Sequence, residues 1–396
     1  MPVQRHDHGA SPRQSKGVQQ AMQKVEECVA TFSTRWIPDA FPIAAGLTFI
    51  VFVAALALTD STAVQLIDAR YDGFWNLLSF AMQMVLIVIT GYGLATATAT
   101  VVQRGLRWLA DRPQTASGAI ITCFLTTGML AFLHWGVALV IGAFLAGAVA
   151  YSSRRRKLGA HFPLIVAAAY GGLAISQTGL SSSAALLVNT PGHFLEDSIG
   201  LLPLSQTIFQ PYALIFVVLV LITGPLLMAS LHPPKDQIIE ISGDDMAKPS
   251  EPSVTTPAEG FANSRILAGL IVAGGLFYVA RYVSASGFTA ISTPMTFPVW
   301  SMISAAIVHM AVPSAGGQWA VQGPIATEAV QQLGLRDHIA GMTAMMGDQL
   351  TNLIQPFWLL PLLGITGLKV GQVLGYTAIL MVLAFTLCAG CLLVLI

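Results

Sequence analysis

Four short runs rich in polar residues, glycine or proline interrupt apolar stretches of this sequence. They lie at 132–136 and 176–183 in the first half, and at 312–319 and 347–356 in the second half. In hydrocarbon every backbone amide needs a partner within the protein, so irregular chain at membrane depth survives only where it is buried or lines a wet cavity. These four runs are therefore the places where we expect binding and transport chemistry.

The run 176–183 holds five hydroxyl side chains and a glutamine within eight positions. An unwound helix would present such groups to a ligand, and a half-helix starting after it would point its positive N-terminal end at an anion. We predict that this run binds a carboxylate, although serine and threonine also simply hydrogen-bond neighbouring helices in membranes. The candidate ligand-binding residues here are Ser176, Gln177, Thr178, Ser181, Ser182 and Ser183.

The run 312–319 is rich in small residues and begins with Val312 and Pro313. This composition predicts the tip of a hairpin, with carbonyls free for a cation or amides free for an anion, rather than a regular helix interior. A plain turn outside the membrane is the alternative. The substrate-binding candidates in this run are Ser314, Gly316, Gly317, Gln318 and Trp319.

The fourth run contains Asp348, and an acid within a membrane span usually marks an ion or proton pathway. If the span begins at Ile339, Asp348 lies well inside it; otherwise it is an interfacial acid. We expect ion coupling at Asp348 and Thr351, and substrate contacts at Asn352 and Gln355.

Two histidines in apolar surroundings could relay protons. They are His134, which we include among the ion-coupling candidates, and His309, to which we give less weight because a membrane histidine is also often a structural residue. The coupling ion is open between Na⁺ and H⁺, and we expect no other cofactor and no metal site.

Composition indicates that lipid is the main solvent of this chain. Of its 396 residues 55% are hydrophobic and 10% charged, and the formal net charge is zero, which does not favour a nucleic-acid partner. A span needs about 20 apolar residues. Five stretches fit an ordinary transmembrane helix: 41–59, 74–97, 211–231, 266–283 and 370–396.

Other apolar stretches do not fit one ordinary crossing. The stretches 163–190 and 339–363 are interrupted, and 297–330 turns glycine-rich after an apolar start. The stretch 117–150 is too long, and it lies between two basic loops that we place in the cytoplasm, one with Arg104, Arg107 and Arg112 and the other at 154–157. It is therefore a re-entrant hairpin or two short spans.

These pieces predict an all-α polytopic membrane protein with about seven transmembrane helices and two re-entrant hairpins in an inverted repeat. A shift of 175 positions places His134 on His309, Gly142 on Gly317 and Gly172 on Gly347. Inverted repeats with interrupted helices are typical of secondary transporters. The predicted parts are a cytoplasmic segment (1–40) with an amphipathic helix, a first repeat (41–232), an acidic Pro/Ser-rich linker (233–262) and a second repeat (263–396). The helix at 18–36 lies in the membrane interface or packs on the cytoplasmic face of the bundle.

Four motifs together resemble the short-chain fatty acid transporter family, within the ion-transporter superfamily of paired hairpins. They are Trp36-Ile37-Pro38-Asp39, the run 72–84, the run 312–319 and Gln355-Pro356-Phe357-Trp358. The resemblance implies uptake of short-chain acids such as butyrate or acetoacetate across a bacterial inner membrane. The second half looks shortened relative to the family, with only 284–298 between a span and the hairpin loop.

We therefore expect a cation-coupled, alternating-access carrier with its N-terminus in the cytoplasm. The run 176–183 and the 312–319 tip would face each other and hold a short carboxylate, with Trp135, Trp319 and Phe357 near its tail. The alternatives are a carrier of a dicarboxylate or amino-acid derivative, and an anion-binding channel or sensor. The sequence contains no HExxH or GxSxG motif, so these signals do not predict an enzyme. The expected partners are the carboxylate and the bilayer, without nucleic acid, and a homodimer is left open.

Overall fold

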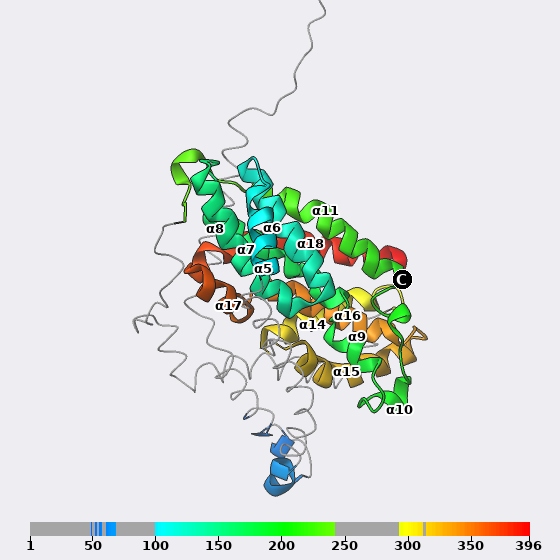
Figure 1. Ribbon diagram of the computed structural model, residues 1–396. Coiled ribbons are helices and arrows are strands. Elements are labelled where there is room, and N and C mark those ends of the chain that lie inside the picture. Colours follow the sequence, from blue (N-terminus) through cyan, green and yellow to red (C-terminus); the bar gives the residue numbers. More distant parts are fainter. Residues whose placement is uncertain are drawn as a thin grey trace, which may run out of the picture.

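The computed structural model describes residues 49, 52–53, 55–57, 61–68, 100–241, 293–311 and 314–396. Apart from turns and loops, these residues are helical, with no strand among them. Figure 1 shows α6, α7, α8 and α11 on one side of the molecule and α14, α15 and α16 on the other, with the short α9 beside the second group. The prediction of an all-α fold is confirmed. The predicted spans 74–97 and 266–283 and the helix at 18–36 lie outside the described residues.

The stretch 117–150 forms a helical hairpin whose arms are α6 (Ala116–Leu133) and α7 (Trp135–Arg155). We predicted irregular chain over 132–136, but only His134 leaves the helical conformation, with φ −160° and ψ 107°. The reason is capping, because the His134 ring Nδ1 accepts a hydrogen bond from the Val137 amide at 3.3 Å and starts α7 at once. Each arm has the length and composition to cross a membrane.

The next span is interrupted as predicted. It consists of α8 (Phe162–Gly171), the tighter 3₁₀ helix η1 (Gly172–Thr178), a break, and α9 (Ser183–Val188). The short helices α10 (Glu196–Ile199) and η2 (Leu204–Gln206) follow in the loop to α11. The break thus divides this span close to one end.

The second hairpin consists of α14 (Phe297–Ala311) and α15 (Ala315–Gln332). The prediction of irregular chain through residue 319 was wrong, because α15 begins at Ala315 and includes Gly316 and Gly317. Its start is fixed by Ser314, whose hydroxyl accepts a hydrogen bond from the Gly317 amide at 3.3 Å. Both hairpins therefore turn at a residue that caps the following helix.

The irregular segment of the last interrupted span is shorter than the run 347–356 that we predicted. The helix α16 (His338–Asn352) runs through Gly347 and Asp348, and only residues 353–355 separate it from α17 (Pro356–Thr366). The break stands before Pro356, which lacks an amide hydrogen and disfavours the helical conformation in Gln355. Asp348 consequently lies well inside a helix, with 0% exposure.

Two ordinary predicted spans are confirmed as helices, α11 (Pro211–Ser230) and α18 (Leu374–Leu395), the latter preceded by η5 (Val370–Gln372). In the described part of the chain, five helical segments are long and apolar enough to cross a membrane: α6, α7, 162–188, α11 and α18. On α11 the outward residues Val218, Ile222 and Leu226 are apolar and exposed. Such a face suits contact with lipid.

Two glycines 175 positions apart hold each interrupted span against the first arm of the hairpin in its own half. A Cβ on Gly172 would lie 2.6 Å from the Gly128 amide nitrogen of α6. A Cβ on Gly347 would overlap the Met302 carbonyl oxygen of α14 and lie 2.9 Å from the Ala306 nitrogen. Backbones approach this closely only where a side chain is missing.

Two residues of the first basic group, Arg104 and Arg107, lie on a helix, α5 (Thr100–Asp111), rather than in a loop as we predicted, and Arg112 directly follows it. The apolar residues of α5 recur at helical spacing, which favours an amphipathic helix. The second basic group binds the end of this helix: Arg155 pairs with the Asp111 carboxylate at 3.0 Å, and Arg156 donates to the Ala110 and Asp111 carbonyls. Cations at a helix C-terminus are favourable.

The segment after α11, which includes η3 (Lys235–Gln237), lies across the turn between α7 and α8. The Phe162 amide donates to the Ile239 carbonyl at 2.8 Å, and the Ile239 amide donates to His161 Nδ1 at 3.0 Å. Arg154 donates to the Ile241 carbonyl at 2.6 Å. The beginning of the predicted linker is therefore fastened to the first half through a neutral His161 ring.

Acid is expected to release this segment. Burial first, and the neighbouring His232 second, lower the pKa of His161 from 6.5 to about 4. Between pH 6.5 and pH 4, His161 binds a proton when the segment is released and does not when the segment is bound. The segment is therefore bound most strongly above pH 6.5, and its free energy of binding weakens by up to about 3 kcal/mol as the pH falls toward 4. Hydrogen exchange at the Ile239 amide, corrected for its intrinsic rate, should quicken over this range. A His161→Gln variant should not show this trend, and equal protection of the wild type at pH 7 and pH 4.5 would contradict the prediction.

Candidate functional site

The first break is closed by side chains that bond to the backbone of the break itself. Gln177 Oε1 accepts a hydrogen bond from the Ser183 amide at 2.9 Å, and the Thr178 hydroxyl donates to the Ile175 carbonyl. All six predicted binding residues of this run are buried: Ser176, Gln177, Thr178, Ser181, Ser182 and Ser183. This burial agrees with a site inside the protein.

The tip of the first hairpin packs on this break. The Ser181 hydroxyl accepts from the Trp135 amide at 2.9 Å, and the Leu180 amide donates to the Phe132 carbonyl at 2.7 Å. A Cβ on Gly179 would overlap the Phe132 backbone, so the approach requires a glycine there. The break and the tip therefore form one unit.

The second half has a corresponding contact. Gln355, in the break before α17, donates to the His309 carbonyl near the end of α14 at 2.6 Å. The His309 ring lies beside Asp348 of α16, with Nε2 3.3 Å from Oδ1 and side chains 0% and 1% exposed. Asn352, one turn on, donates to the other oxygen of Asp348 at 3.4 Å.

The two halves meet at these breaks. The backbone amide of Gln177 donates a hydrogen bond to Gln349 Oε1 at 2.9 Å, and the Tyr170 hydroxyl donates to the backbone carbonyl of Asn352 at 2.8 Å. Trp135 lies edge-on to Trp358, with ring centroids 5.4 Å apart. We call the five residues Gln177, His309, Asp348, Gln349 and Asn352 the polar junction.

Not every predicted residue reaches this junction. Gln318 is buried on α15 and donates to the Ala305 carbonyl of α14 and to Gln322, while Ser314 serves as a helix cap. Among the described residues no hydrogen bond joins 314–319 to 176–183, and the two runs approach through Trp319 and α9 instead. The expected face-to-face arrangement of break and tip stays a prediction.

The ion-coupling candidates occupy different environments. Asp348 lies in the polar junction. The Thr351 hydroxyl bonds back to the carbonyls of Gly347 and Asp348 in its own helix, and His134 is a half-buried helix cap. A role in ion coupling stays a prediction for all three, and of the three Asp348 has a second ionisable group, His309, beside it.

Sequence reasoning missed two residues of the junction. Gln349 was not selected, although it follows Asp348 directly, and His309 was ranked below His134. The signal available for His309 was its correspondence with His134 under the shift of 175 positions, together with its apolar surroundings.

Several buried polar atoms of the junction and of the predicted binding runs beside it in the sequence have no hydrogen-bond partner within the described part of the chain. Leaving such an atom unpaired costs about 1–3 kcal/mol, so a group of them favours a site that receives a ligand or water. The group contains donors and acceptors: Trp135 Nε1, Ser182 Oγ, Gln318 Oε1, Trp319 Nε1, Gln349 Nε2, Asn352 Oδ1 and Gln355 Oε1.

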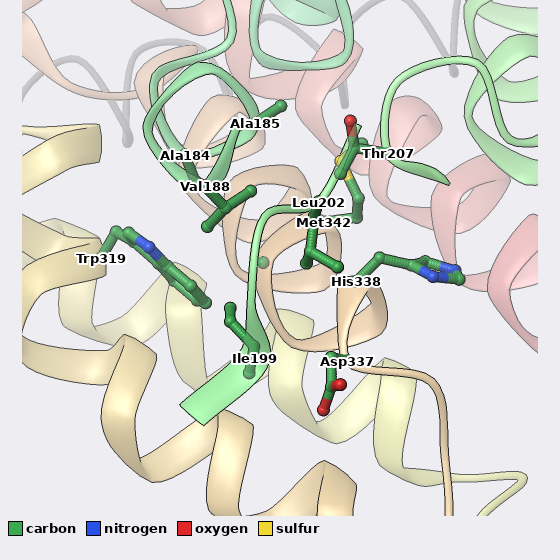
Figure 2. A pocket seen from close by; sticks show the side chains of 11 residues that line it. Ala184, Ala185, Val188, Ile199, Leu202, Thr207, Trp319, Asp337, His338 and Met342 are labelled. Atoms are coloured by element: carbon green, nitrogen blue, oxygen red, sulfur yellow. The ribbon is translucent and has the colours of Figure 1, made fainter. Parts of the chain in front are cut away.

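A small apolar pocket lies next to these groups, between α9, α15 and α16. Its volume is about 10 Å³, room for about one water molecule. Figure 2 shows the Trp319 ring on one side and Met342 on the other, with Val188 and Ile199 between them. Ala184 of the pocket follows Ser183 of the break, and Trp319 follows Gln318, so polar and apolar surfaces adjoin along both segments.

Charge in the interior is limited to acid and imidazole. Among the described residues, the buried ionisable side chains other than thiols and phenols are Asp348 and four histidines, with no lysine or arginine. Cys123, Cys388 and Cys391 are free and buried. An anion entering this site would meet neutral donors and no permanent positive charge.

Membrane-length helices, interrupted spans and a buried polar junction define this molecule as a multi-pass membrane protein with the architecture of a transport protein. The chain belongs to the short-chain fatty acid transporter family, whose model matches residues 21–292 and 285–395. The recognition made from the motifs is confirmed. The two matched stretches meet where the sequence predicted the shortened segment.

Two curated relatives are similar over most of their length. Proteins of Escherichia coli (strain K12) and Haemophilus influenzae, both named "Putative short-chain fatty acid transporter", are each 30% identical to this chain, over 424 and 434 aligned positions. Each alignment covers 89% of this chain and 95% of the relative. The alignments are longer than the 396 residues of this chain, so the relatives have residues that it lacks. No solved structure matches the chain.

Proposed function

We propose that this protein is a secondary active transporter of short-chain fatty acids, such as butyrate or acetoacetate, which couples uptake to a cation and works by alternating access. The observation that carries the proposal is the polar junction, where the break of one half is hydrogen-bonded to a helix of the other half beside a buried acid. The names of the family and of both relatives support the substrate class.

The substrate carboxylate would take the unpartnered donors near the junction. Gln349 Nε2, Trp135 Nε1 and the Ser182 hydroxyl can each donate one hydrogen bond to an oxygen, and buried donors prefer a charged acceptor. The short tail would extend toward Trp319 and the apolar pocket beside α9. Because this pocket holds about one water molecule, its walls would have to move apart to admit the tail.

We propose that the two halves form an inverted repeat with re-entrant hairpins. Support comes from the equivalent contacts of Gly172 and Gly347, and from hairpin ends that bond to the break of their own half. The tip sequence around His134 has no lysine, arginine or acid, which suits the protein interior better than a surface loop. The basic groups at 104–112 and 154–157 favour a cytoplasmic N-terminus, and the bacterial relatives favour the inner membrane.

Uptake of labelled acetoacetate into proteoliposomes tests this function. Its carboxyl group is more acidic than that of butyrate, so less of the membrane-permeant neutral acid is present. We expect saturable uptake above the rate of protein-free liposomes, inhibited by excess butyrate and not by succinate. Absence of saturable uptake under imposed Na⁺ and H⁺ gradients would refute the proposal, and inhibition by succinate alone would indicate a dicarboxylate carrier.

A single added methyl group is expected to shorten the accepted tail. Gly341 lines the apolar pocket, and a Cβ there would lie 3.6 Å from the nearest atom of the Trp319 ring, an ordinary contact that needs no rearrangement. The Gly341→Ala variant should keep acetate transport and lose about fivefold in kcat/KM for butyrate, because one lost methylene contact is worth about 1 kcal/mol. Competition between labelled acetate and unlabelled butyrate measures the ratio. An unchanged ratio would exclude this pocket from tail binding.

A further inference from the structure

His309 and Asp348 face each other in the interior without a well-formed hydrogen bond. His309 Nε2 and Asp348 Oδ1 lie 3.3 Å apart, yet neither atom, nor His309 Nδ1, has an aligned partner within the described part of the chain. A neutral ring supplies a donor to this contact only when its hydrogen is on Nε2, whereas one added proton, on the ring or on the carboxyl, supplies a donor in either tautomer. The geometry is that of a pair built to hold one proton between two groups.

The charge balance of the pair points the same way. A carboxylate beside a neutral imidazole is an uncompensated buried anion, which is costly in the low-dielectric interior of a membrane protein. One proton makes the pair neutral overall, as carboxylic acid with imidazole or as carboxylate with imidazolium. The pair thus gains more from one proton than from none or from two.

In the part of the chain that the structure describes, no other acid or base of the elements packed on α14 and α16 compensates the charge of the pair. The helices α14 and α16 contact α15, α18, α9 and η1, and α9 and η1 contain no titratable residue. Tyr170 of α8 faces Asn352 with its hydroxyl rather than the pair itself. The remaining titratable groups of α15, α16 and α18 are Glu328, which is exposed, His338 at the start of α16, Tyr376, Cys388 and Cys391.

A sodium ion fits these residues less well. Na⁺ is a hard cation that takes several oxygen ligands, as Ca²⁺ and Mg²⁺ do, whereas the Asp348 oxygen faces an imidazole nitrogen. Because the described interior holds no lysine or arginine, His309 is also the group beside Asp348 that can become positive when a carboxylate arrives.

We propose that the His309–Asp348 pair binds one proton for each carboxylate transported, which makes the protein a proton symporter. The inference rests on the proposed transport function and names its coupling ion. A proton from external water binds the pair, the carboxylate binds beside it, and after the conformational change both leave to the internal water. The complex moves with no added charge, whereas an unaccompanied carboxylate would work against about 2.3 kcal/mol per 100 mV of membrane potential.

Calorimetry of the purified full-length protein tests the proposal. Acetoacetate is titrated at pH 7 in two buffers of different ionisation enthalpy, which gives the number of protons taken up on binding, and the titration is repeated with Na⁺ replaced by choline. We expect proton uptake that rises toward one per acetoacetate as the free pair deprotonates, and then an affinity that falls about tenfold per pH unit, with no effect of Na⁺.

The matched variants are Asp348→Asn, which keeps the size of the side chain, and Asp197→Asn, an exposed acid of α10. Proton uptake should vanish in the first and persist in the second. Acetoacetate binding without proton uptake at any pH from 6 to 9, or binding that requires Na⁺, would overturn the proton assignment and leave the transport function standing. Failure of acetoacetate, butyrate and acetate to bind at all would instead remove the function and this inference together.

Discussion

A Gly347→Ala variant is expected to lose most of its folded protein. The new methyl group would overlap the Met302 carbonyl oxygen and lie 2.7 Å from the Ala305 side chain, both on α14, which packs along α16. A backbone group has little room to move, so the overlap should cost about 3 kcal/mol or more, well above the gain of about 1 kcal/mol from a better helix former. Thermal unfolding in detergent, followed by tryptophan fluorescence, measures the loss.

The matched control for this glycine is Gly390→Ala. Gly390 lies inside the helix α18, and a Cβ there meets no atom within 4 Å. That variant should unfold at the wild-type temperature or slightly above it. Equal behaviour of the two variants would show that α14 and α16 are not in close backbone contact at Gly347.

Loss of the side-chain amide of Gln349 is expected to lower transport strongly while the protein still folds. In a Gln349→Met variant the new side chain has a similar size, so the packing is kept. The backbone amide of Gln177 loses its acceptor, and an unpaired buried donor costs about 1–3 kcal/mol. The substitution also removes the Nε2 donor that we assign to the carboxylate. We expect the two losses together to lower kcat/KM for acetoacetate at least a hundredfold.

The Gln332→Met variant controls for the chemical change. Gln332 is exposed on α15, and its side-chain amide donates a hydrogen bond to Glu328, one turn away. It should transport at the wild-type rate. Transport by Gln349→Met within threefold of the wild type would exclude this side chain from the substrate path.

The helices were largely predictable because their signals are local. The span 211–231 is continuously apolar and needs no partner to be recognised, and the structure places α11 at Pro211–Ser230. The ends of the hairpin arms were not predictable to the residue. They depend on which side chain caps the next helix, a ring nitrogen at His134 and a hydroxyl at Ser314, and composition around a tip does not rank these choices.

The site was predictable in kind but not in its pairing. The density of hydroxyl groups at 176–183 predicted burial of a polar break, and all six chosen side chains there are buried. The contacts of Gln349 with Gln177 and of His309 with Asp348 join residues 172 and 39 positions apart. Such contacts follow from how α14, α16 and η1 pack, which is a property of the whole fold.

The glycine contacts at positions 172 and 347 resist displacement more strongly than the hydrogen bonds that join the two halves beside the breaks. Steric contact between backbones resists displacement steeply, so each span and the hairpin arm beside it should move as one stiff body. The bonds from Gln177 to Gln349 and from Tyr170 to Asn352 contribute about 1 kcal/mol each and can exchange partners at thermal energies. The two halves are therefore each rigid, and the hydrogen-bonded contact between them beside the breaks is the part that deforms most easily.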